Sequence, residues 1–110
     1  MYIHQREKNG VLICSIGGEL TIDTVGELKK TFKILLGNKW SKIVFNLEKL
    51  DYIDSSGLAA LVEFSIDLKA IQGVMILASL PPKIRSIFGI TKLEKMFTIC
   101  ETEEEALGSL

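Results

Sequence analysis

An acid, two hydroxyls and a glycine lie together near the middle of the chain, in the stretch LDYIDSSGLAAL, residues 50–61. Asp54 and Ser55 precede a segment with helical spacing of its apolar residues, so both can lie beside the unpaired N–H groups that begin a helix. These groups and the helix dipole favour an anion, which would stabilise a phosphate on Ser55. Gly57 has no Cβ and would let the backbone of a partner approach that hydroxyl. The stretch is therefore suited to carry a phosphoserine.

Of the two serines, Ser55 is the predicted phosphate acceptor because it directly follows Asp54 and precedes the helix proper. Ser56 lies one residue deeper. We expect its hydroxyl to bond to the backbone of the turn or to Asp54, which would limit its access to a kinase.

Other chemistries of the same stretch are less well supported. The pattern D-S-S-G alone fits a simple helix cap better than a phosphorylation site. A hydrolase would need a base for Ser55, whereas the only histidine, His4, has no carboxylate at a suitable spacing, and there is no G-x-S-x-G motif. A phosphoacceptor role for Asp54 would need an acidic pair for Mg²⁺, and Glu19 stands alone. We expect no catalytic residue, no metal site and no cofactor.

The first half of the chain predicts a hairpin, a helix and a buried strand. Residues 2–7 and 11–16 are strand-like runs joined by an Asn-Gly turn. The segment TVGELKKTFKILL has apolar residues on one helical face, and Thr24 and Glu27 have the spacing of a capping box. The segment KIVFNL, residues 42–47, is apolar and β-branched, as a buried strand requires.

The second half continues the alternation. Residues 56–72 carry an apolar stripe, residues 74–78 read as a central strand, and residues 83–88 as a short helix after two prolines. A last strand over 97–100 precedes a terminal helix capped by Thr102. Met75 and Met96 are predicted to lie in the core. We predict an α/β fold, with a mixed sheet of four or five strands, about four helices and the order ββαβαβαβα.

Composition limits the partners. The 110 residues suit one domain, and 13 basic against 14 acidic residues give a net charge of −1, with no basic cluster that would indicate nucleic acid or a membrane surface. No apolar run is long enough to span a bilayer. Cys14 and Cys100 match neither a metal motif nor a disulfide framework. We expect a cytoplasmic protein with reduced thiols that binds other proteins or small ligands.

Four segments together resemble the STAS domain family, and specifically the small bacterial anti-sigma factor antagonists that consist of this domain alone. The segments are VLICSIGGEL, KIVFNLEKLDYIDSSGLAALV, GVMILASLPPKIRSIFGITKLEKMF and TEEEAL, in the order and approximate spacing of the family. The resemblance extends over almost the whole chain, which implies one STAS domain over residues 1–110.

The resemblance implies a partner-switching cycle. In such proteins the serine after the aspartate, here Ser55, is phosphorylated by a partner that is both an anti-sigma factor and an ATP-dependent serine kinase. The unphosphorylated antagonist binds this partner and releases its sigma factor, phosphorylation ends the binding, and a phosphatase resets the cycle. We expect the residues that contact the partner to be Asp23, Asp54, Ser56, Gly57 and Leu58.

The chain departs from the family pattern at two positions. Many members have an acidic residue directly after Gly-Glu-Leu, where this chain has Thr21 and then Asp23 two positions later. Glycine is also common where this chain has Ala59. The alternative is a STAS subunit that acts as an adaptor in a larger assembly, such as a lipid-transport complex, and keeps Ser55 only as part of a helix cap.

Overall fold

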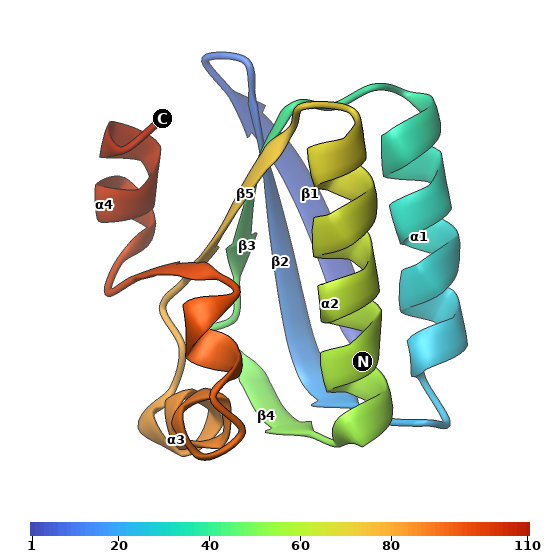
Figure 1. The fold of residues 1–110 in the computed structure, drawn as a ribbon, viewed down its shortest axis with the longest axis vertical. Helices are drawn as coiled ribbons and strands as arrows, with labels where there is room; N and C mark the ends of the chain where they lie inside the picture. Colours follow the sequence, from blue (N-terminus) through green and yellow to red (C-terminus); the bar gives the residue numbers. More distant parts are fainter.

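A mixed β-sheet forms the centre of the computed structural model, which describes residues Met1–Leu110, and helices lie on both of its faces (Figure 1). The strands are β1 (Tyr2–Lys8), β2 (Val11–Leu20), β3 (Lys42–Asn46), β4 (Leu50–Ile53), β5 (Val74–Ala78) and β6 (Thr98–Cys100). The helices are α1 (Val25–Gly37), α2 (Ser55–Ala70), α3 (Pro82–Ile90) and α4 (Glu103–Gly108), with a 3-10 turn, η1 (Leu93–Lys95).

The strand order is β1-β2-β3-β5-β6. Strand β4 lies outside this order and pairs with the C-terminal end of β2, at Gly18–Leu20. Only β1 and β2 are antiparallel, as the Asn-Gly turn between them requires, and every other pair is parallel. The predicted fold class is therefore confirmed. The sheet has six strands instead of the four or five expected.

The additional strand is β4, which the sequence patterns left in the turn before α2. It has only four residues, of which Leu50 and Ile53 are buried and the two between them exposed, so no alternation of period two exists to reveal it. Pairing with β2 sets Ile53 opposite Leu20. This pairing brings the residue after β4, Asp54, to the end of β2.

Helices α1 and α2 lie side by side on one face of the sheet, and α4 lies on the opposite face (Figure 1). Three phenylalanines join the first layer to the sheet: the rings of Phe32 and Phe64 stack with centroids 4.2 Å apart, and Phe45 of β3 meets both edge-on. On the other face, Ala106 of α4 packs in a smaller apolar cluster. The Thr102 hydroxyl accepts a hydrogen bond from the Glu105 N–H at 3.1 Å, which confirms the predicted cap of α4.

Two local predictions are wrong. The Thr24 hydroxyl does not cap α1, because it accepts a hydrogen bond from the Thr21 N–H at 2.9 Å and donates one to the Glu19 carbonyl at 2.9 Å. Met96 is 42% exposed, because the turn after η1 directs the neighbouring Phe97 into the core in its place. Met75 is buried, as predicted.

None of the helices is both long enough and apolar enough to cross a membrane.

Candidate functional site

Asp54 lies where β2, β4 and α2 meet. Its backbone N–H donates to the Leu20 carbonyl at 3.1 Å, which continues the pairing of β4 with β2 by one residue. Its carbonyl accepts from the Leu58 N–H at 3.0 Å, which is the first bond of the helix. The extended backbone of Asp54 thus ends the strand and begins α2, as expected for an N-cap residue.

The Asp54 carboxylate uses both oxygens. Oδ1 accepts from the Gly57 N–H at 3.0 Å and caps α2, and Oδ2 accepts from the Ile22 N–H at 3.0 Å in the loop between β2 and α1. The bond from Gly57 is the main reason that the pKa of Asp54 lies below its ordinary value. Desolvation raises the pKa in opposition, and the N–H groups of Ile22 and Ser56 lower it further. Asp54 therefore remains ionised at neutral pH.

The loop between β2 and α1 is also held by its own threonines. The Thr24 N–H donates to the Thr21 carbonyl at 3.0 Å, and the Asp23 N–H donates to the Thr21 hydroxyl at 3.2 Å. Asp23 itself is exposed, and Ile22 beside it is 69% exposed. The loop thus presents an apolar and an acidic side chain from a fixed backbone.

Both serines of the motif have unbonded hydroxyls. Ser55 is the first residue of α2 and is exposed, whereas Ser56 is half-buried. Neither hydroxyl makes a hydrogen bond within the chain, so the expected bond from Ser56 to the turn or to Asp54 is not formed. The capping that the motif predicted belongs to Asp54 alone.

Gly57 faces the interior instead of a partner. A Cβ at this position would lie 2.7 Å from Leu20 Cγ and 2.8 Å from Ile53 Cγ1. The glycine is therefore required by the close approach of α2 to the ends of β2 and β4, and the predicted role in admitting a partner's backbone is wrong. Leu58 is also buried, in the main core cluster, so its side chain packs the first turn of α2 against the core.

One protein-family model matches nearly the whole chain. The family model for the STAS domain matches residues 2–106. The chain belongs to the STAS domain family.

Other STAS proteins resemble this one over most of their length. BtrV of Bordetella bronchiseptica, a predicted anti-sigma factor antagonist, is 26% identical over 101 residues, which cover 92% of this chain and 87% of BtrV. The crystal structure of a predicted anti-sigma factor antagonist from Thermotoga maritima is 25% identical and has a TM-score of 0.91, with 97% of this chain and 92% of that chain covered.

Structures of SpoIIAA have been solved in an unphosphorylated and in a phosphorylated form. The anti-sigma factor antagonist SpoIIAA in its unphosphorylated form is 22% identical, with a TM-score of 0.75 and coverage of 98% of this chain and 96% of that chain. The phosphorylated form of the Bacillus SpoIIAA is 24% identical, with a TM-score of 0.74 and coverage of 98% of each chain. At this identity, the likeness to SpoIIAA establishes the fold.

The surface of this STAS domain around Ser55 combines an exposed hydroxyl with exposed apolar side chains. Besides Ile22, Tyr52 of β4 is 50% exposed and pairs in register with Glu19 of β2. The sequence patterns did not identify either residue as part of the site. The signal for Ile22 was present, since an apolar side chain between Thr21 and Asp23 in a loop has no amphipathic element to bury it.

The only histidine of the chain lies away from the end of β2 where α2 begins. His4 lies on β1 opposite Ser15, in the middle of β2 instead of at its end. No group of three or more His, Cys, Asp or Glu side chains lies close enough together to hold a metal ion. The arrangement places the exposed Ser55 hydroxyl on the first residue of α2, beside the carboxylate of Asp54, which is ionised at neutral pH.

Proposed function

We propose that this STAS domain is an anti-sigma factor antagonist, and that phosphorylation of Ser55 switches it off. The observation that carries the proposal is the exposed, unbonded Ser55 hydroxyl on the first residue of α2. Asp54 holds that helix start in place through Gly57 and Ile22. A kinase would therefore meet the hydroxyl in a defined position, with no internal hydrogen bond to break.

The unphosphorylated domain binds an anti-sigma factor that has serine kinase activity, and the sigma factor is then released. The names of the relatives BtrV and SpoIIAA support an antagonist role. The contact surface would comprise the loop residues Ile22 and Asp23 together with Ser55 and Tyr52. Exposed apolar and aromatic side chains at the centre of a contact carry most of its binding energy.

Phosphorylation would end the binding through charge and hydration. It adds about −1.5 to −2 charges beside Asp54, which is already ionised, and a large hydrated group next to the apolar side chain of Ile22. A loss of only about 1.4 kcal/mol in binding free energy weakens affinity tenfold. A phosphatase would restore the binding form. The domain itself would catalyse nothing.

The direct test is phosphorylation in vitro. The purified domain is incubated with ATP and a candidate anti-sigma factor kinase, and intact mass spectrometry followed by peptide mapping reports the modified residue. We expect one phosphate on Ser55, none in Ser55→Ala, and unchanged modification in the matched variant Ser56→Ala. Phosphate on Ser56, or no phosphate with a kinase that modifies another STAS domain, contradicts the proposal.

A further inference from the structure

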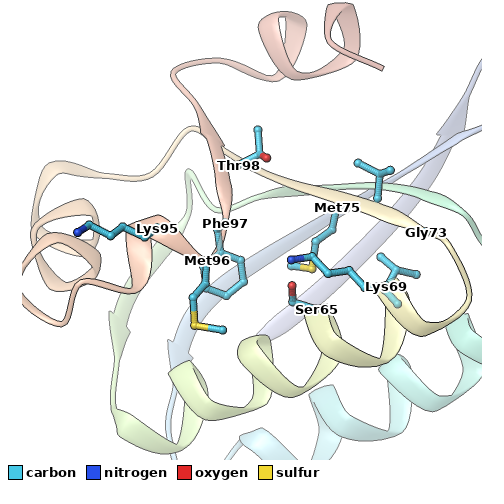
Figure 2. Close-up of a pocket in the computed structure, with 10 residues that line it drawn as sticks. Ser65, Lys69, Gly73, Met75, Lys95, Met96, Phe97 and Thr98 are labelled. Carbon is cyan, nitrogen blue, oxygen red and sulfur yellow. The ribbon is translucent and has the colours of Figure 1, made fainter.

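A cavity of about 280 Å³ lies beside the C-terminal half of α2, between this helix, the start of β5 and the segment that follows η1 (Figure 2). Ser65 and Lys69 line it from α2, Met75 from β5, and Met96 and Phe97 from the segment after η1. It is separate from the proposed phosphorylation site, since Ser65 lies roughly 15 Å further along the helix than Ser55 at 1.5 Å per residue.

Ser65 has an unusual environment for a helical serine. It is 4% exposed, and its hydroxyl makes no hydrogen bond within the chain. The hydroxyls of Thr31, Ser86 and Thr91 all donate to the carbonyl four residues earlier. Figure 2 shows the Ser65 oxygen directed into the cavity instead. Every fully buried side-chain nitrogen and oxygen of the domain has a hydrogen-bond partner, so the Ser65 oxygen is open to the cavity and free to bond to a polar group that enters it.

Lys69 supplies positive charge to the same part of the cavity. It lies one turn after Ser65, and Figure 2 shows its amine directed toward the Ser65 hydroxyl, while the amine of Lys95 points away. Lys69 takes no part in either ion pair of the domain, which join Arg6 to Glu103 and Arg85 to Glu94. No carboxylate lines the cavity. The polar group that fits here is therefore an anion.

Much of the remaining wall is apolar and adaptable, although Lys95 and Thr98 also line it. Leu68, Met75, Met96 and Phe97 line it, and methionine side chains adjust readily to ligands of different shape. At roughly 30 Å³ of liquid volume for each water-sized group, the cavity has room for about nine such groups.

We infer that this cavity binds a small amphiphilic carboxylate. The carboxylate lies between the Ser65 hydroxyl and the Lys69 amine, and the alkyl chain lies against Met75, Met96 and Phe97. Hexanoate and octanoate bracket the expected size. A few polar groups that orient a ligand within an apolar wall are typical of small-molecule sites.

The test is a titration of the isotope-labelled domain with octanoate and with octanol, followed by the amide signals of Ser65, Lys69 and Phe97. We expect saturable shifts of these signals, with octanol bound at least about threefold more weakly than octanoate because it lacks the charge that Lys69 recognises. Lys69→Glu should weaken octanoate binding by about fivefold and leave octanol binding nearly unchanged.

Two variants complete the test. Lys30→Glu on α1 makes the same charge change at an exposed residue that lines no cavity, and it should leave octanoate binding unchanged. Ser65→Ala should weaken octanoate binding by roughly five- to tenfold, as expected for loss of a hydrogen bond. Equal affinity for octanoate and octanol, equal losses in Lys69→Glu and Lys30→Glu, or no saturable shift in the wild type would overturn the inference.

Discussion

The carboxylate of Asp54 accepts a hydrogen bond from the Ile22 N–H at 3.0 Å and thereby ties the start of α2 to the loop after β2. Its second oxygen caps the helix through the Gly57 N–H. One side chain thus fixes both the helix residue that carries the candidate hydroxyl, Ser55, and the most exposed apolar side chain of the loop. The position of Ile22 relative to Ser55 should therefore depend on Asp54.

Replacing Asp54 by Ala should destabilise the domain. The change removes the cap of α2 and the acceptor for the Ile22 N–H together, which should lower the Tm by several degrees in a domain of this size. Thermal unfolding followed by circular dichroism measures this. The matched control is Asp51→Ala, since Asp51 is an exposed carboxylate of β4 without a side-chain hydrogen bond, and an equal loss in both variants would contradict the role of Asp54.

The stabilisation by Asp54 should be present at neutral pH and be lost in acid. The bond from the Gly57 N–H leads the causes that hold the pKa of Asp54 below its ordinary value. A depressed pKa stabilises the fold above the unfolded value of about 3.9, and this contribution is lost as the pH falls through the folded value. The difference in Tm between the wild type and Asp54→Asn should therefore be constant near neutral pH and shrink below about pH 4. A difference that grows in acid would refute the assignment.

The parts of the site that could be predicted from sequence are those that depend on local order. The D-S-S-G pattern predicts a cap and an exposed serine from residues that are neighbours in the chain, and both are present in Asp54 and Ser55. Gly57 was misread because its burial depends on Leu20 and Ile53, which only the pairing of β4 with β2 brings together. The bond from Ile22 to Asp54 is likewise invisible without that pairing.

Gly57→Ala and Gly26→Ala should have opposite effects on stability. A methyl group at Gly57 would overlap Leu20 and Ile53, which should cost about 1–3 kcal/mol of unfolding free energy, as overpacking commonly does. Gly26, in the first turn of α1, has no atom within 4 Å of an added Cβ, so alanine there should stabilise by about 0.5–1 kcal/mol. Urea denaturation of the two variants measures both. Equal effects would mean that α2 does not approach β2 and β4 as described.

The thiol of Cys14 should be inert in the folded domain. Its side chain is 0% exposed, and burial raises its pKa to about 12. Near neutral pH the thiolate fraction is therefore lower, on the order of a thousandfold, than that of a free thiol with a pKa of about 8.5. In Cys100→Ala, where Cys14 is the remaining cysteine, Ellman's reagent should react only after urea is added. Rapid reaction under native conditions would show that β2 is less protected than the packing requires.

Replacing Ser55 by Ala should preserve partner binding and block inactivation, whereas replacing it by Asp should weaken binding less than phosphorylation does. The Ser55 hydroxyl makes no hydrogen bond and Asp54 provides the cap, so alanine should change the unfolding free energy by no more than about 0.5 kcal/mol. Asp adds one negative charge close to the backbone. A phosphate carries nearly twice that charge on three oxygens held further into the partner's space.

Titration of the anti-sigma factor against the wild type, Ser55→Ala, Ser55→Asp and the phosphorylated domain measures this order of affinities. Ser41→Ala is the matched control, since it removes an exposed hydroxyl outside the predicted contact residues. Two results would contradict the switch: a folded Ser55→Ala variant that binds much more weakly, or a phosphorylated domain with unchanged affinity. Either result would favour a STAS adaptor, because an adaptor needs the helix start that Asp54 fixes but has no use for a modifiable hydroxyl on Ser55.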